Sequence, residues 1–353
     1  MKNIPSKLVK AKDVIIKWFL IGCNLLLSLF ILNLFSGSFL ELHTRTSSEK
    51  EDGNSKLFII KQNQSLQDVA ARLEEAGLIP SKKNFLQWII RMNLDRTIQT
   101  GRFHIKKDFS LWKIIKKLCN HASSMEKITF PEGLNLRQTF NLLEEYGLDK
   151  SKLLLLSRDK AFIESLNIEV SSLEGFLFPD TYFIYYGEDE KKVLKMMVKR
   201  FHEIIGSLNI ASSVCYQSHG LYTGIILASI IEKEAAYPPD RPHVSSVFWN
   251  RLNQNWRLDA DTTVHYILNQ WQRPLTRQDL KVDSPYNTRR YKGLPPTPIC
   301  NPGRVSIQAA FFPDKSKDMF FICSGDEVGS SIFSRTHSEH NQIKKKLKKE
   351  GKL

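Results

Sequence analysis

The sequence predicts an α+β protein in which a single N-terminal transmembrane helix is followed by a small βα unit and a larger mixed α/β domain. Three observations predict this class: an uncharged apolar stretch near the N-terminus, a strand–turn–helix pattern that recurs after it, and an apolar helix in the second half that carries two glutamates. With 353 residues, the chain is long enough for one or two domains with cores of their own.

The apolar stretch covers residues 18–40, which are 23 residues without a charge, and a helix needs about 20 residues to cross a bilayer. Lysines dominate residues 1–17, whereas acidic residues outnumber basic ones in the polar linker 41–54. This asymmetry places residues 1–17 in the cytoplasm and everything after residue 40 on the outer side of the membrane. A cleaved signal peptide is the alternative, because residues 36–38 are small, but the stretch is long for one and ends in bulky side chains.

The formal net charge of +14 raises the question of nucleic-acid binding. The basic residues are spread along the chain and no nucleic-acid-binding fingerprint occurs, so we expect no nucleic-acid partner and interpret residues 343–353 as a solvated basic tail. The five cysteines are widely spaced, which leaves their redox state open. His337 and His340 have no third ligand nearby, so we expect a packed C-terminal turn there and predict neither a metal nor another cofactor.

Residues 55–124 contain the strand–turn–helix pattern twice, and a third copy opens the following domain. Each copy has a β-rich run, a turn and an amphipathic helix with apolar residues at i, i+3 and i+4 spacing. Ser65 and Ser110 stand at the positions of helix N-caps. The unit resembles a LysM-like sugar-binding domain, in which Trp88 and Trp112 would stack on sugars; at helical spacing, however, aromatic residues more often belong to a core.

The apolar helix is expected over residues 223–236 and carries Glu232 and Glu234 near its C-terminal end. A helix that is apolar nearly all round is a buried one. Residues two apart on a helix point about 200° apart, so the two carboxylates cannot both enter one cleft. Glu234 shares its face with aliphatic side chains, which raise a carboxyl pKa, and the helix dipole acts in the same direction. This favours Glu234 as a general acid; the alternative is that either glutamate pairs with Lys233 or Arg241.

Six sequence blocks then occur in order: LEGFLFPDTY (173–182), ASIIEKEA (228–235), VFWNRL (247–252), SPYNT (284–288), GLPPTPICNPG (293–303) and HSEHNQ (337–342). Together with the anchor and the LysM-like unit, they resemble the endolytic murein transglycosylase family (MltG, or YceG-like) over roughly residues 57–342. The resemblance implies a mixed α/β lytic-transglycosylase catalytic domain in residues 125–342.

In that family the second glutamate of the EKE block is catalytic, which corresponds to Glu234. The resemblance implies cleavage of the β-1,4 bond between N-acetylmuramic acid and N-acetylglucosamine within nascent peptidoglycan strands, which leaves 1,6-anhydro ends and limits strand length. It implies a single-pass protein of the bacterial cytoplasmic (inner) membrane with an extracytoplasmic catalytic domain, glycan strands as its substrate, and peptidoglycan synthases as partners. Two alternatives stay open: a muramidase that uses Asp259 or Asp261 as a second carboxylate, and a non-catalytic wall-binding scaffold.

The resemblance also implies four substrate-binding residues, Tyr286, Asn287, Asp261 and Arg251. The Tyr–Asn pair would hold an N-acetyl group and orient the glutamate, unless it forms a turn in which the asparagine bonds to the backbone. Arg251 would bind a peptide-stem carboxylate, unless it forms a structural ion pair. Asp261 matches a family aspartate, but the neighbouring Asp259 and Thr263 stand where the family usually has Gln and Pro.

Overall fold

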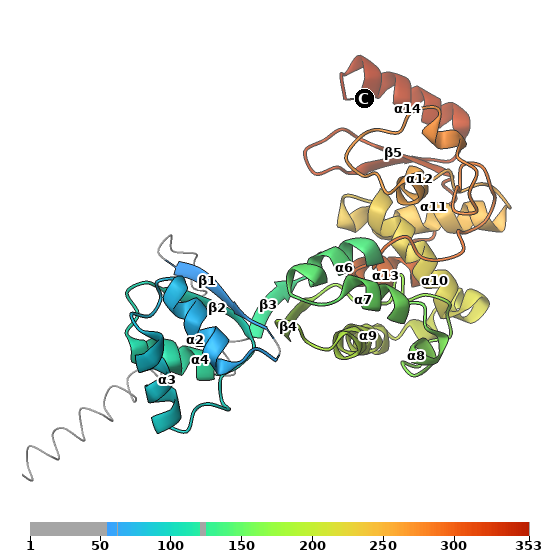
Figure 1. Ribbon diagram of the computed structural model, residues 1–353. Coiled ribbons are helices and arrows are strands. Elements are labelled where there is room, and N and C mark those ends of the chain that lie inside the picture. The colour runs from blue at the N-terminus through green and yellow to red at the C-terminus, as the bar shows by residue number, and fades with distance from the viewer. Residues whose placement is uncertain (1–54, 62, 121–124, 353) are drawn as a thin grey trace, which may run out of the picture. The chain divides into compact units, whose positions relative to one another are not determined.

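The computed structural model describes residues 55–61, 63–120 and 125–352 (Figure 1). The predicted transmembrane helix at residues 18–40 and its two flanks lie outside these residues. Nearly all described residues belong to one compact unit, Lys56–Leu353. Within the described residues, one helix, α10 (Val214–Glu234), is long and apolar enough to cross a membrane by length and composition, and its residues 224–231 are buried in the protein core.

The first described part is built from two strands and three helices. They are β1 (Ser55–Ile60), α2 (Leu66–Glu75), α3 (Lys82–Arg91), β2 (Gly101–Lys106) and α4 (Leu111–Cys119), and β1 pairs with β2. Both predicted N-caps are confirmed, since Ser65 accepts a hydrogen bond from the Asp68 amide at 3.1 Å and Ser110 accepts one from the Lys113 amide at 3.3 Å. The strand–turn–helix pattern of the sequence therefore gives the correct local structure here.

This part has a hydrophobic core of its own, centred on fully buried side chains such as Phe85 and Phe103. Trp88 on α3 and Trp112 on α4 do not belong to it: their side chains are 48% and 52% exposed. The assignment of these two residues to the core, which helical spacing favoured, is therefore wrong. An apolar stripe shows which helix faces are rich in hydrophobic residues, but it does not show which of its aromatic members remain at the surface.

Residues 125–352 form a mixed α/β structure, as the sequence predicts. The helices and strands are β3 (Met125–Thr129), α6 (Leu136–Glu145), α7 (Lys150–Leu156), α8 (Lys160–Glu164), β4 (Thr181–Tyr185), α9 (Glu190–Ser207), α10, α11 (Arg241–Asn253), α12 (Asp261–Leu268), α13 (Arg304–Phe311), β5 (Phe320–Cys323), β6 (Ser331–Ser334) and α14 (His337–Lys349). Strand β3 pairs antiparallel with β4, with Met125 opposite Tyr185 and Thr129 opposite Thr181. Strands β5 and β6 form a second antiparallel pair.

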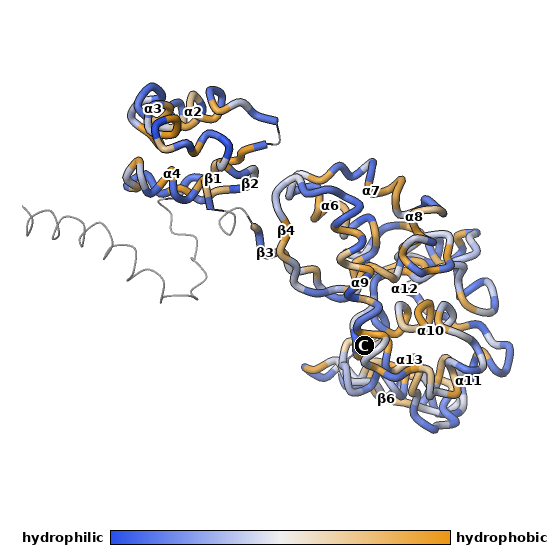
Figure 2. The backbone as a smooth tube through the Cα atoms, turned by 90° about the horizontal axis from the view of Figure 1, so that it is seen from below, coloured by the Kyte–Doolittle hydropathy of each residue, from blue (hydrophilic) through white to orange (hydrophobic). Residues whose placement is uncertain are grey.

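Helix α10 is the central core helix of this part, and its apolar composition is visible in Figure 2. Every residue from Gly224 to Ile231 is buried, and the helix packs against α11, α12 and α13. Gly224 permits a close approach to α13, because a Cβ atom added there would lie only 2.1 Å from the ring of Phe311. The prediction of a buried apolar helix is confirmed for the part of α10 that follows the non-helical backbone of Gly220, and the two glutamates lie at its C-terminal end.

Asn301 joins segments of this part that are far apart in the sequence. Its side chain is buried, and its Oδ1 atom accepts hydrogen bonds from the amides of Gly175 at 3.0 Å and Leu177 at 3.1 Å. Its Nδ2 group and its backbone amide both donate to the carbonyl oxygen of Leu134, at 3.0 and 2.8 Å. One polar side chain therefore fixes the loop before β4 against the start of α6.

The C-terminal segment corrects two expectations. His337 and His340 do not lie in a turn but in the first turns of α14, which begins with a capping box between Thr336 and Glu339. The helix continues to Lys349 and buries Leu347, so residues 343–353 are not simply a solvated tail. Lysine is a good helix former, and a helix allows one apolar side chain to reach the core while its lysines remain in solvent.

Candidate active site

The two glutamates at the end of α10 have different surroundings, as their opposite directions on the helix predict. Glu232 accepts hydrogen bonds from Nη2 of Arg241 at 2.9 Å and from the Gly303 amide at 2.9 Å. Its side chain is 5% exposed and that of Arg241 is 8% exposed. For Glu232, the ion-pair alternative is therefore confirmed: the carboxylate joins the end of α10 to α11 and caps the start of α13.

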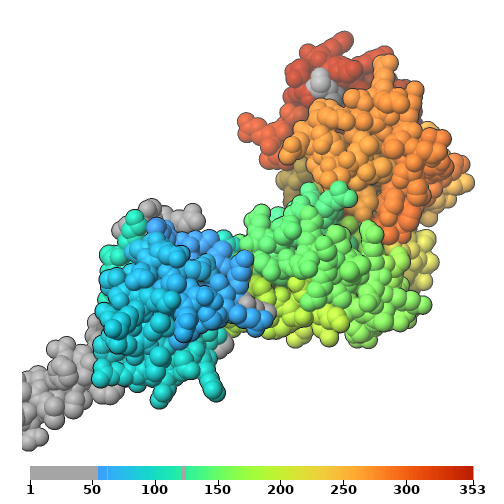
Figure 3. Space-filling view, viewed as in Figure 1, coloured from blue at the N-terminus to red at the C-terminus, as the bar shows by residue number. Residues whose placement is uncertain are grey.

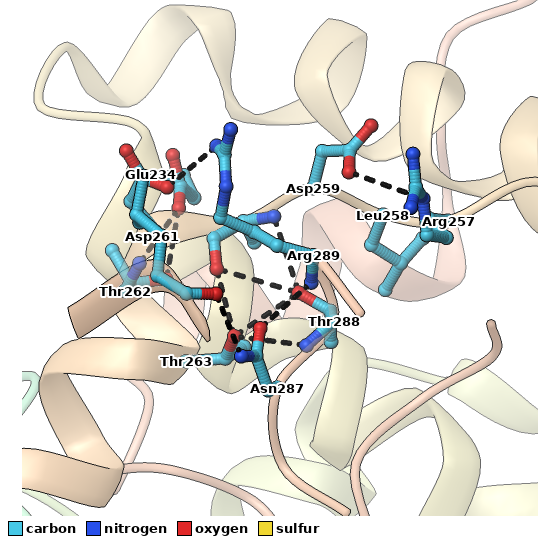
Figure 4. Close-up of polar contacts among 12 residues, drawn as sticks. Glu234, Arg257, Leu258, Asp259, Asp261, Thr262, Thr263, Asn287, Thr288 and Arg289 are labelled. Carbon is cyan, nitrogen blue, oxygen red and sulfur yellow. Dashed lines mark hydrogen bonds and ion pairs between the residues drawn. The ribbon is translucent and has the colours of Figure 1, made fainter. Parts of the chain in front are cut away.

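Glu234 has no cationic partner of this kind among the described residues. Its Oε1 atom accepts two hydrogen bonds from Thr262, one from the hydroxyl at 2.8 Å and one from the backbone amide at 3.3 Å (Figure 4). Thr262 is the second residue of α12, so its amide is one of the N–H groups that a helix start leaves without an intrahelical acceptor. Glu234 is thus held in one orientation by neutral donors.

The electrostatic surroundings favour the protonated form of Glu234. Burial raises its pKa above the ordinary glutamate value, and the nearby charge of Asp261 raises it further. The hydrogen bonds from Thr262 and the charge of Arg251 act in the opposite direction, but the net pKa shift is upward. A positioned carboxyl group with a raised pKa is what proton donation near neutral pH requires.

Asp261 lies beside this group at the first position of α12. Its Oδ1 atom forms an ion pair with Nη1 of Arg289 at 2.7 Å, and its side chain is 53% exposed. Asp259, the other candidate for a second carboxylate, has a left-handed backbone with φ of 51° and lies 3.6 Å from Arg257. Both aspartates therefore have guanidinium partners, but Asp261 is the one whose charge acts on Glu234.

Asn287 lies in the interior, with no solvent-exposed surface. Its Nδ2 group donates to the carbonyl oxygens of Leu280 and Val282, at 3.1 and 2.8 Å, and its Oδ1 accepts from the Arg289 amide. These hydrogen bonds match the alternative in which Asn287 belongs to a turn and bonds to the backbone. The arrangement therefore favours a role for Asn287 in shaping the loop that carries Arg289, the partner of Asp261.

Tyr286 lies differently from its neighbour in the sequence. Its hydroxyl is 2.8 Å from the Thr297 hydroxyl, and its ring centroid is 5.2 Å from that of Tyr266 on α12. Both tyrosines line a cavity, which leaves Tyr286 available for contact with a ligand.

Arg251 is buried and points at backbone atoms. Its Nε donates to the carbonyl of Met319 at 2.7 Å and its Nη1 donates to the carbonyl of Leu258 at 2.5 Å. The side chain thereby fixes the segment just before α12. This placement favours a structural role for Arg251 over binding of a peptide carboxylate. The structural role differs from the expected ion pair, because the partners of Arg251 are backbone carbonyl oxygens.

Three residues of this region were not singled out by sequence analysis: Thr262, Glu174 and Tyr266. The sequence gives no signal for Thr262, because threonine is common near helix starts and does not by itself indicate a functional residue. Glu174 offered a usable signal, since it is a single carboxyl inside the apolar run 173–178. It is buried, and it accepts hydrogen bonds from the Leu136 amide at 3.0 Å and the Tyr266 hydroxyl at 3.1 Å.

Neither a disulfide nor a metal cluster is found in the described part of the chain. Cys119, Cys215, Cys300 and Cys323 are free, and no three His, Cys, Asp or Glu side chains among the described residues lie together as metal ligands would. Fold and site together define a class of mixed α/β proteins whose buried core helix ends in a glutamate, Glu234, with a raised pKa.

Comparison with known proteins is consistent with this class. Residues 58–346 match the model of the YceG-like family. An endolytic murein transglycosylase of Bacillus subtilis (strain 168) is 30% identical over 315 residues, which cover 84% of this chain and 86% of that protein. An endolytic murein transglycosylase of Streptococcus pneumoniae (strain ATCC BAA-255 / R6) is 26% identical over 331 residues, and the chain spans only 58% of its length.

A solved structure is similar as well. The crystal structure of a yceG-like protein from Listeria monocytogenes superposes with a TM-score of 0.59 at 30% sequence identity, and the match covers 82% of this chain and 99% of that chain. The chain belongs to the YceG-like family.

Proposed function

We propose that this protein is an endolytic lytic transglycosylase that cleaves the β-1,4 bond between N-acetylmuramic acid and N-acetylglucosamine inside peptidoglycan strands. Support comes from family membership and from relatives of Bacillus subtilis and Streptococcus pneumoniae that carry this activity in their names. The observation that carries the assignment of the acid is the contrast within α10: Glu232 is fixed as an ion-paired structural carboxylate, whereas Glu234 has only neutral donors and a raised pKa.

In the proposed reaction, protonated Glu234 donates its proton to the bridging oxygen, and the bond from that oxygen to C1 of the muramyl residue breaks. The N-acetylglucosamine strand leaves with a hydroxyl group. The glutamate, now a carboxylate, accepts the proton of the muramyl C6 hydroxyl, whose oxygen forms the new bond to C1. One carboxyl group serves as acid and then as base, so no water is consumed and the product carries a 1,6-anhydro ring.

Thr262 has a defined part in this cycle. Its two hydrogen bonds to Oε1 leave Oε2 of Glu234 as the oxygen that exchanges the proton with the substrate. The same bonds stabilise the carboxylate that forms after the first step, because N–H and O–H donors bind an anion more strongly than a neutral acid. Thr262 therefore limits the pKa increase that burial alone would produce.

The membrane-related assignments form part of the same proposal. Residues 18–40 would be retained as a single-pass anchor with residues 1–17 in the cytoplasm, which would hold the catalytic part near the synthases that make new strands. Residues 55–124 would act as a LysM-like unit that binds glycan, with exposed Trp88 and Trp112 as surfaces on which sugar rings stack.

The decisive experiment is mass analysis of the products released from purified peptidoglycan by the full-length protein. Muramyl ends that weigh one water less than hydrolysed ends support the transglycosylase. Reducing muramyl ends as the main product would reject it in favour of a muramidase, with Asp261 as the second carboxylate because its charge acts on Glu234. Absence of both products would favour the non-catalytic scaffold.

A further inference from the structure

A cavity of about 670 Å³ adjoins the candidate site through α12. Its walls come from the start of α6, the end of α7, residues 171–174, the second half of α12 and residues 284–297. These stretches are far apart in the sequence, and their surfaces, green and orange in Figure 3, adjoin one another. The mechanism described above assigns no role to this cavity.

The charges on the cavity wall are unbalanced. Arg137 and Arg158 are exposed and line it, and neither has an ion-pair partner among the described residues. The one carboxyl group among the lining residues is Glu174, whose pKa is raised to about 8 by burial, so near neutral pH it is largely uncharged. The cavity therefore presents two guanidinium groups without a compensating anion.

The position of the cavity relates it to the candidate acid. Thr262, which holds Glu234, and Tyr266, which lines the cavity, are four residues apart on α12, a rise of about 6 Å along the helix. The tyrosines Tyr266 and Tyr286 form an aromatic wall, and the hydroxyl of the first donates to the buried carboxyl of Glu174. A ligand in the cavity would thus lie next to a glycan strand bound at Glu234.

We propose that this cavity binds a carboxylate of the peptide that branches from the muramyl residue of the substrate, with Arg137 and Arg158 as its ligands. The inference rests on the proposed function and names the part of the substrate that the site reads. Guanidinium groups pair with carboxylates through two parallel N–H donors, and the peptide is where the substrate carries such carboxylates. The role expected for Arg251, which is occupied by backbone carbonyls, falls to these two arginines instead.

Direct binding tests the inference without relying on activity. Full-length protein in detergent is titrated with a synthetic stem peptide that has free carboxylates, and with the same peptide after amidation of every carboxylate. The acidic peptide is expected to bind at least tenfold more tightly, and Arg137→Gln or Arg158→Gln should each weaken its binding about tenfold. Arg277→Gln is the matched control, because Arg277 is exposed and does not line the cavity.

Equal binding of the two peptides would overturn the proposal, and so would an equal loss in the Arg277→Gln protein. Competition by inorganic phosphate as effective as that by the acidic peptide would also overturn it, because it would indicate a general anion site. Thermal unfolding of each variant verifies that the exposed substitutions leave the fold intact.

Cleavage provides the second readout. On strands that carry peptides, kcat/KM of the Arg137→Gln/Arg158→Gln double variant should fall at least tenfold, with no change on strands from which the peptides have been removed by an amidase. An equal decrease on both substrates would contradict the inference. If the wild-type protein cleaves neither substrate but still discriminates between the peptides, the proposed activity fails while the peptide site stands.

Discussion

Nη2 of Arg241 lies 2.9 Å from Oε1 of Glu232. This ion pair distinguishes Glu232 from Glu234, which is only two residues further along the chain. Both members are almost fully buried, and the second oxygen of Glu232 accepts from the amide of Gly303. Glu232 is thereby held as the partner of Arg241 and of the start of α13. Glu234, on the other side of the helix, remains free to change protonation state.

Replacing Glu234 by Gln should reduce strand cleavage at least about a hundredfold, because the amide has the same size but cannot donate and recover a proton. The measurement is the rate of anhydromuramyl end formation by purified full-length protein. Thermal unfolding should be little changed, since an amide oxygen can still accept from Thr262. Undiminished cleavage would exclude Glu234 as the acid.

Replacing Glu232 by Ala should act on stability rather than on chemistry. It leaves Arg241 buried without its main partner and the Gly303 amide without its acceptor, a loss of about 3 kcal/mol. Glu132, 3.6 Å from Arg241, can compensate in part. Chemical denaturation measures the change. A large loss of activity without a loss of stability would show that Glu232 takes part in the reaction.

The pH dependence of cleavage should change when the Thr262 hydroxyl is removed, because its hydrogen bond lowers the pKa of Glu234. Protonated Glu234 is the active form for the first step, so activity is present below its pKa and is lost as the pH rises through it. Thr262→Val removes the hydroxyl bond that lowers this pKa, and it should therefore move the alkaline limb of kcat/KM to higher pH. Thr262→Ser keeps the hydroxyl and serves as the control. Identical profiles for wild type and Thr262→Val would contradict the assigned role.

Glu174 should make stability depend on pH. Its folded-state pKa is about 8 against an ordinary value of 4.5, so the folded protein binds the extra proton between these values. The free energy of unfolding should fall as the pH rises from about 4.5 to about 8, with a slope of at most about 1.4 kcal/mol per pH unit. Denaturation at several pH values checks this, and Glu174→Gln should flatten the curve. A wild-type curve as flat as that of the variant would refute the raised pKa.

The topology predicted from the N-terminal lysines is testable with a reporter that works only in the cytoplasm. Fused after Leu353, it should be inactive, whereas the same reporter fused before Met1 of the full chain should be active. If the C-terminal fusion were active, the predicted orientation would be wrong.

The features that the sequence predicts correctly are local ones. The caps at Ser65 and Ser110 depend on neighbouring amides, and the different environments of Glu232 and Glu234 follow from helix periodicity. These rules need no knowledge of the rest of the fold, which explains why they succeed.

What the sequence leaves open depends on contacts between distant segments. Asn287 and Arg251 donate their side-chain hydrogen bonds to backbone carbonyl oxygens. Every residue has such an oxygen, so the sequence does not show which ones accept these bonds. The pairing of β3 with β4 joins residues more than fifty positions apart, and the cavity is assembled from five stretches. No local pattern indicates such encounters.

The bonds of Asn301 have a consequence for the order in which the protein acquires its structure. The amides of Gly175 and Leu177 and the carbonyl of Leu134 obtain their buried partner from a residue more than 120 positions further along the chain. Contacts of such long range form slowly, because the intervening chain must first close a large loop. A ribosome supplies the N-terminal segments first, so the loop that carries Glu174 can obtain these hydrogen bonds only after residue 301 has been synthesised.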